Sequence, residues 1–146
     1  MAASPKTLTV RQFFGRKGLL SEWHPGYEYR EGQLRMAEAV ESAADRFRLL
    51  INPIIYAEVS IRYSRVEDLE AALPKAMLDR EAIPYEAAFL AGKCFLVYRQ
   101  RGGTKRSPLP DFFIGAHAAV AGYRLLTRDA ACYRSYFPRL PLIAPD

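Results

Sequence analysis

The apolar positions of this chain follow helical spacing in some segments and form short continuous runs in others. From Glu31 onward, apolar residues recur every three or four positions, which predicts an amphipathic helix. The run Arg48–Ile51 predicts a short buried strand. Asn52 and Pro53 then form a typical helix start, with asparagine as the N-cap and proline at the first helical position. We expect that helix to reach Ser64. The apolar positions of the first helix are Leu34, Ala37, Val40, Ala44 and Phe47.

The rest of the chain repeats this alternation of helices and short strands. Further helices are predicted over Val66–Leu73, Tyr85–Arg101 and Pro110–Ala121, strands over Tyr123–Leu126 and Leu142–Ala144, and a loop or short helix over Arg128–Tyr136. In the second of these helices, Phe89, Phe95 and Tyr98 occupy the apolar positions. This order predicts an α/β fold with a short central parallel sheet flanked by helices. Because ligands of such sheets bind beyond the carboxyl ends of the strands, polar residues there are the candidates for function.

The first 30 residues depart from this pattern. Thr7–Val10 is compatible with a short strand, whereas Arg11–Leu20 has no clean period. The stretch Trp23–Tyr27 contains a Pro-Gly pair, which indicates a turn. The chain shows no internal repeat and no low-complexity linker. We therefore predict one domain over residues 1–146, with residues 1–30 as an atypical N-terminal segment.

The composition indicates how large a core the chain can bury and in which cellular compartment we expect it. The chain has 146 residues, of which half are hydrophobic, so it can bury one sizeable core. No apolar run approaches the roughly 20 residues that a membrane-spanning helix needs. Arg11, Arg16 and Lys17 interrupt the N-terminus, which argues against a secretory signal. Cys94 and Cys132 have no metal-type spacing and are expected to be ordinary thiols. We expect a cytoplasmic protein without a membrane segment.

The charge of the chain is compatible with a polyanionic partner. Twenty-one basic residues against 16 acidic ones give a formal net charge of +5. One cluster contains no acid, which suits contacts with RNA phosphates. The alternative is that these charges only keep the surface soluble. The members of the cluster are Arg99, Arg101, Lys105 and Arg106.

Three acidic residues stand at unusual places in the predicted fold. Glu58 lies within the apolar stripe of its helix, where a carboxylate tends to be desolvated, although a surface position at the margin of the stripe would also explain it. Asp111 lies in the first turn of a nearly apolar helix, where the helix dipole alone would stabilise it. Asp129 follows a buried strand, although polar residues are also common where a strand ends and the chain returns to the surface. All three are expected near strand carboxyl ends or helix N-termini.

Converging carboxylates would repel one another unless a divalent cation lay between them. Mg²⁺ prefers oxygen ligands, and beside a basic surface it could support the cleavage of phosphodiesters. Thr127 and Asn52 are placed to assist near Asp129 and Glu58, although both also have ordinary strand-end and capping roles. His117, on the apolar helix, is interpreted as a hydrogen-bonded core residue.

At this point the chain resembles a known family. Leu50–Glu58, Leu109–Ala118 and Leu125–Asp129 resemble, in order and spacing, the acid-bearing segments of PIN domains. The resemblance continues through Tyr136–Leu140, spans about residues 47–146 and is strongest to bacterial VapC toxins. It implies a Mg²⁺- or Mn²⁺-dependent endoribonuclease, usually homodimeric and held inactive by a cognate antitoxin. Its catalytic and metal-binding acids would be Glu58, Asp111 and Asp129.

The start of the chain departs from the family pattern. PIN domains open with a short strand that ends in an Asp, and this Asp is a central metal ligand. Here no acid precedes Glu22, and the first Asp is Asp45. Two hypotheses follow: an active metal-dependent endoribonuclease, or a PIN-like protein that binds RNA or an antitoxin but cleaves little. A metal-free α/β domain with another function would require the agreement of the motifs to be chance.

Overall fold

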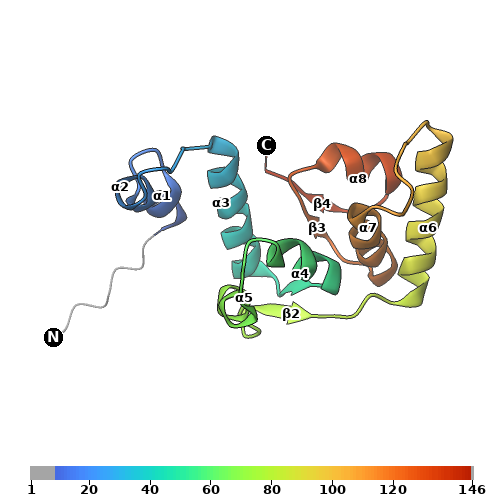
Figure 1. Ribbon diagram of the computed structural model, residues 1–146, viewed down its shortest axis with the longest axis horizontal. Helices are drawn as coiled ribbons and strands as arrows, with labels where there is room; N and C mark the ends of the chain where they lie inside the picture. Colours follow the sequence, from blue (N-terminus) through green and yellow to red (C-terminus); the bar gives the residue numbers. More distant parts are fainter. Residues whose placement is uncertain (1–8, 146) are drawn as a thin grey trace.

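A computed structural model describes residues 9–145 of the protein (Figure 1). The helices are α1 (Val10–Phe14), α2 (Leu19–Trp23), α3 (Glu31–Arg46), α4 (Pro53–Ser60), α5 (Val66–Ala72), α6 (Tyr85–Gln100), α7 (Pro110–Ala121) and α8 (Ala130–Tyr136). The strands are β1 (Leu49–Ile51), β2 (Leu78–Arg80), β3 (Leu125–Leu126) and β4 (Leu142–Ile143). The predicted α/β class is confirmed. Among the described helices, none is both long and apolar enough to cross a membrane.

The strands form two parallel pairs. β1 pairs with β2, from Leu49 opposite Leu78 to Ile51 opposite Arg80. β3 pairs with β4. The predicted parallel strands are therefore present, but within residues 9–145 they belong to two separate two-stranded sheets instead of one continuous sheet. The sequence did not predict β2, because Asp79 and Arg80 interrupt its apolar character. The pairing of β2 with β1 depends on backbone hydrogen bonds, which these side chains do not prevent.

The N-terminal segment is helical where a strand had been expected. Thr7 and Leu8 of the predicted strand lie outside the described residues, but Thr9 is an N-cap and Val10 begins α1. The cap is reciprocal, because Thr9 Oγ1 accepts from the Gln12 amide at 3.2 Å and Gln12 Oε1 accepts from the Thr9 amide at 3.0 Å. Such a capping box satisfies two amide groups that a helix start leaves free. This local hydrogen bonding favours a helix here.

Helices α1 and α2 lie to one side of the rest of the molecule and are connected to it through α3 (Figure 1). Arg11 of α1 forms an ion pair with Glu38 of α3 at 2.7 Å, and the Tyr27 hydroxyl donates to the Phe14 carbonyl at 2.9 Å. The predicted helix is confirmed as α3, but its buried positions differ from those expected. Leu34 and Ala43 are buried, whereas Val40, Ala44 and Phe47 are exposed. This segment is therefore held together by its own contacts.

The core is centred on the packing of α6 against α7. Ala87 and Ala91 of α6 are fully buried, and their small side chains allow the two helices to approach closely. Phe112 of α7 is 1% exposed and lies in edge contact with the rings of Tyr98 and Tyr136. The prediction that Pro110–Ala121 is a buried helix is confirmed. Gly122 ends this helix at φ 73°, a left-handed conformation that glycine adopts without strain.

Candidate functional site

The three candidate acids lie on three different helices. Asp111 is in the first turn of α7, Asp129 is the N-cap of α8, and Glu58 is in the second half of α4. The Tyr133 hydroxyl donates to Asp111 Oδ1 at 3.0 Å, and the Cys132 amide donates to Asp129 Oδ1 at 3.0 Å. The structure therefore brings Asp111 and Asp129 to the start of α8.

The charges of all three acids act on this part of α8. Burial raises the pKa of the Cys132 thiol, and the charges of Asp111 and Asp129 raise it further. Burial also raises the pKa of the Tyr133 hydroxyl, with the charge and hydrogen bond of Asp111 next and a smaller contribution from Glu58. With the pKa of both groups raised, the Cys132 thiol and the Tyr133 hydroxyl keep their protons at neutral pH.

The arrangement does not fit a resident divalent metal. Within residues 9–145, no three His, Cys, Asp or Glu side chains are grouped closely enough to hold one. One oxygen of Asp111 accepts from Tyr133, and one oxygen of Asp129 caps α8. Glu58 is exposed instead of desolvated, which agrees with a position at the margin of its apolar stripe. The missing first-strand acid and this geometry both argue against a resident divalent metal at this site.

The pKa of Tyr133 gives a prediction for alkaline solution. The folded protein holds this proton more tightly than the unfolded chain, in which tyrosine titrates near pH 10. The resulting stabilisation is complete below about pH 10 and is lost as the pH rises toward the folded-state pKa. Urea denaturation should therefore show a larger loss of stability between about pH 8 and 11 in the wild type than in Tyr133→Phe. Equal losses in the two proteins would contradict this account.

A second polar cluster joins β1, β2 and α7 in the interior. Asn52 Oδ1 accepts from the amides of Ile54 and Ile55 at 3.1 and 3.0 Å, so its Nδ2 is the atom that faces His117 Nδ1 at 3.2 Å. His117 Nδ1 is then an acceptor, and Nε2–H donates to Glu81 Oε1 at 3.1 Å. The ring hydrogen that faces Glu81 is therefore on Nε2. Both predictions, Asn52 as an N-cap and His117 as a hydrogen-bonded core residue, are confirmed.

Glu81 and Tyr123 complete the cluster and were not predicted. The Tyr123 hydroxyl donates to Glu81 Oε2 at 2.6 Å. This bond, followed by the bond from His117, lowers the pKa of the Glu81 carboxyl, so Glu81 stabilises the fold above its ordinary pKa and loses this effect in acid. Glu81 is 42 residues from Tyr123 and 36 from His117, so no local pattern identifies these contacts.

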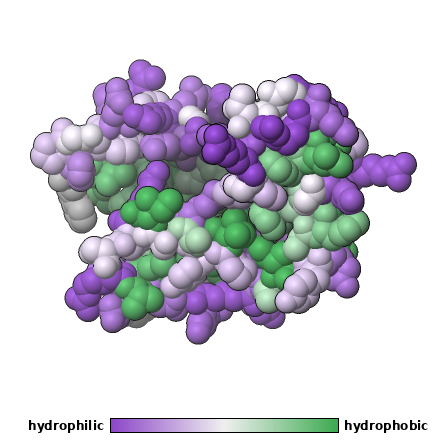
Figure 2. Space-filling model, turned by 45° about the vertical axis from the view of Figure 1, so that its right-hand side comes forward, coloured by the Kyte–Doolittle hydropathy of each residue, from purple (hydrophilic) through white to green (hydrophobic). Residues whose placement is uncertain are grey.

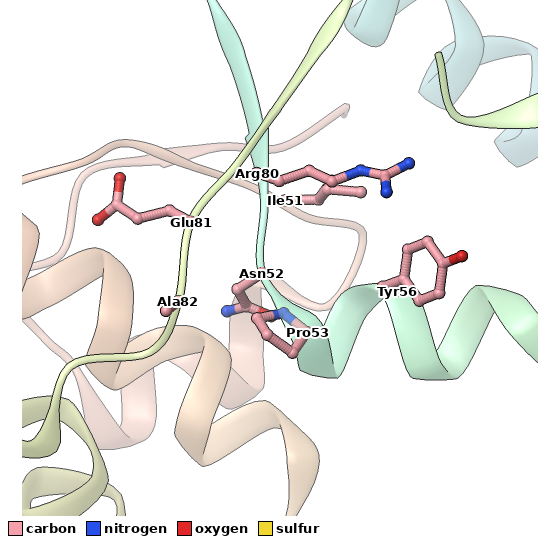
Figure 3. A pocket seen from close by; sticks show the side chains of 7 residues that line it. All are labelled: Ile51, Asn52, Pro53, Tyr56, Arg80, Glu81 and Ala82. Atoms are coloured by element: carbon pink, nitrogen blue, oxygen red, sulfur yellow. The ribbon is translucent and has the colours of Figure 1, made fainter. Parts of the chain in front are cut away.

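A pocket of about 330 Å³ lies at the carboxyl ends of β1 and β2 (Figure 3). Sheet topology predicts a ligand site at this place. Tyr56 and Arg80 point to one side of the pocket in Figure 3, and both bind Glu70 Oε1, at 2.7 and 2.9 Å. On α4, Tyr56 and Glu58 differ by two positions, which places them on nearly opposite sides of the helix. The pocket and the acids at α8 are therefore separate features. The residues that line the pocket are Ile51, Asn52, Pro53, Tyr56, Arg80, Glu81 and Ala82.

The four basic candidates for RNA contact divide into two kinds. Arg99 Nη1 donates to the carbonyls of Gly103 and Lys105, at 2.9 and 3.2 Å, and so holds the loop after α6. Arg101 donates to Ser135 Oγ at 2.9 Å and lies over the Tyr136 ring. Within residues 9–145, the side chains of Lys105 and Arg106 form no hydrogen bond or ion pair, so they remain the stronger candidates.

The supporting residue Thr127 has a local role. Its Oγ1 accepts from the Asp129 amide at 3.1 Å, which orients the residue that caps α8. Cys94 and Cys132 are both free thiols, as the sequence predicted. Burial raises the pKa of the Cys94 thiol, so the thiolate form is disfavoured at neutral pH.

Comparison with known proteins identifies the fold. No family model matches the chain, and no curated protein matches its sequence. Among solved structures, VapBC2 from Rickettsia felis, bound to a DNA fragment from its promoter, matches with a TM-score of 0.56 and 20% identity over 75% of this chain and 83% of the other. VapBC-1 from nontypeable Haemophilus influenzae matches with a TM-score of 0.57 and 16% identity over 73% and 84%. The chain therefore has a VapC-like PIN-domain fold.

Proposed function

We propose that this chain is a VapC-like toxin component that binds RNA and a cognate antitoxin but cleaves RNA inefficiently. One observation carries the proposal: Asp111 and Asp129 meet at α8, yet within residues 9–145 no third metal-binding side chain joins them. The similar structures are VapBC complexes, which supports an antitoxin partner for this chain as well. Lys105 and Arg106 supply free cations for RNA phosphates.

A metal-dependent endoribonuclease is the second candidate. The specific observation in its favour is that the charges of Asp111, Asp129 and Glu58 all act on Cys132 or Tyr133. If Mg²⁺ or Mn²⁺ bound, these three acids would hold it. The two candidates differ in the expected rate of RNA cleavage and in the expected affinity for Mn²⁺.

Cleavage and metal binding separate the two candidates. The purified full chain is incubated with a structured RNA hairpin in Mg²⁺ or Mn²⁺, beside Asp111→Asn. We expect the wild type to cleave no faster than Asp111→Asn, and calorimetric titration with Mn²⁺ to show no micromolar site. Faster cleavage by the wild type, by about 100-fold or more, would establish the active enzyme instead.

RNA binding is tested with a charge reversal that leaves the loop bonds of Arg99 intact. In Lys105→Glu/Arg106→Glu we expect weaker binding of the same hairpin and a salt dependence reduced by about 1.4–1.8 in logarithmic slope, because two phosphate contacts are lost. The double variant Arg62→Glu/Arg65→Glu alters net charge equally at exposed positions outside this cluster. If both double variants bind alike, the loop after α6 does not contact RNA.

A further inference from the structure

The loop after α6, which carries the cations proposed to contact RNA, is bound by two neighbouring side chains of that helix. Tyr98 Oη accepts from the amides of Thr104 and Lys105, at 3.2 and 3.3 Å. Arg99 Nη1 donates to the carbonyls of Gly103 and Lys105, at 2.9 and 3.2 Å. One side chain therefore binds the amides of the loop and the other binds its carbonyls, which fixes the course of the backbone.

The loop passes directly over the ring of Tyr98. The Gly103 amide donates to the Tyr98 carbonyl at 2.9 Å, and a Cβ added to Gly103 would meet Cδ1, Cε1 and Cζ of the ring. Such a close approach of backbone to a ring requires glycine. The ring is held in turn by Phe95 and Phe112, with centroids 6.1 and 5.9 Å away. The loop therefore rests on a ring that the core holds in place.

The backbone of this loop is already satisfied, so its contacts with a nucleic acid come from side chains. The amides of residues 102–105 all donate within the protein. Lys105 and Arg106 are exposed. The loop lies at the upper end of α6 in Figure 1, and Figure 2, which brings that side forward, shows hydrophilic residues along the upper edge of the molecule. A loop that is ordered before binding loses less conformational entropy in the complex.

We propose that Tyr98 is a positioning residue for RNA binding, whose hydroxyl, together with Arg99, holds the loop in the conformation in which Lys105 and Arg106 contact phosphates. This inference rests on the proposed RNA binding and adds the groups that prepare the site for it. The ring of Tyr98 packs against the core, so the residue acts through the loop and not by direct contact with RNA.

Removal of one hydroxyl tests the proposal. Tyr98→Phe keeps the ring that contacts Phe95 and Phe112 but accepts no amide. We expect it to bind the RNA hairpin at least about fivefold more weakly in fluorescence anisotropy, because the loop must then become ordered on binding. The logarithmic salt slope should equal that of the wild type, because the same phosphates are contacted once the complex has formed.

Tyr136→Phe is the matched control, because this ring also contacts Phe112 and its hydroxyl forms no hydrogen bond within residues 9–145. It should bind the hairpin as tightly as the wild type. Amide hydrogen exchange separates positioning from a general loss of stability. In Tyr98→Phe, the amides of Thr104 and Lys105 should exchange faster than in the wild type, whereas those in the middle of α7 should keep their rates.

Two results would overturn the inference. The first is wild-type affinity of Tyr98→Phe for the hairpin while Lys105→Glu/Arg106→Glu binds weakly, which would leave the proposed RNA contact standing without the positioning role. The second is unchanged exchange of the Thr104 and Lys105 amides in Tyr98→Phe. If Lys105→Glu/Arg106→Glu itself binds as tightly as the wild type, the proposed RNA contact fails, and the inference fails with it.

Discussion

Replacement of Asn52 by alanine is expected to lower the free energy of unfolding by about 2–4 kcal/mol. The side chain of Asn52 is 4% exposed and has two structural roles. Its oxygen caps α4 through the amides of Ile54 and Ile55, and an N-cap contributes about 1 kcal/mol. Its amide donates to His117, which is 2% exposed, and a buried acceptor without a donor costs about 1–3 kcal/mol.

Asn52→Asp separates these two roles because it retains the capping oxygen but replaces the donor to His117 with an acceptor. At neutral pH it should lose most of the His117 contribution while keeping the cap. Urea denaturation of the wild type and both variants at neutral pH measures this. A loss of no more than about 1 kcal/mol in Asn52→Ala would mean that His117 does not depend on Asn52.

Replacement of Gly115 by alanine is expected to lower the free energy of unfolding by about 2 kcal/mol, although alanine favours helices. A Cβ at Gly115, in the middle of α7, would meet Phe137 Cε2 and lie 2.7 Å from Phe137 Cδ2. Phe137 is 6% exposed and packs in the core, so its ring has no free space to move into. Overpacking costs about 1–3 kcal/mol, and the helix propensity of alanine returns up to about 1 kcal/mol.

The matched control is Gly92→Ala, also in the middle of a helix but with no atom within 4 Å of the new Cβ. It should raise the free energy of unfolding by about 1 kcal/mol. Thermal and urea unfolding then compare two identical chemical changes. If Gly115→Ala were as stable as Gly92→Ala, Phe137 would not be packed as described.

The elements with the strongest local signals were predicted well, and the short ones were not. The helix over Pro110–Ala121 has the predicted bounds, because Pro110 and Gly122 mark its ends. The strand Leu78–Arg80 was missed, because three residues with two charges carry no periodic signal. The strand expected at Thr7–Val10 is contradicted in its described part, because the capping box of Thr9 stabilises α1.

The candidate site was located by sequence, but its chemistry depends on contacts between distant residues. Asp111 was recognised by its position in the first turn of a helix, and Asp129 by its position after a buried strand. Their hydrogen bonds with Tyr133 and the Cys132 amide, which occupy one oxygen of each, arise only when α7 and α8 pack together. In the same way, the sequence offered Arg99 as a contact for RNA phosphates, whereas in the structure its guanidinium donates to the Gly103 carbonyl.

By itself, the sequence of this protein determined the α/β class, the main helices, the capping role of Asn52 and the absence of an acid before Glu22. These properties depend on residue type and spacing along a few turns of chain, so they can be read locally. Tertiary structure alone decided the division of the strands into two sheets, the hydrogen-bond partners of His117 and the exposure of Tyr85 and Phe89 on α6. Each of these depends on which distant groups exclude water from a side chain or satisfy its hydrogen bonds, and only the packed fold brings those groups together.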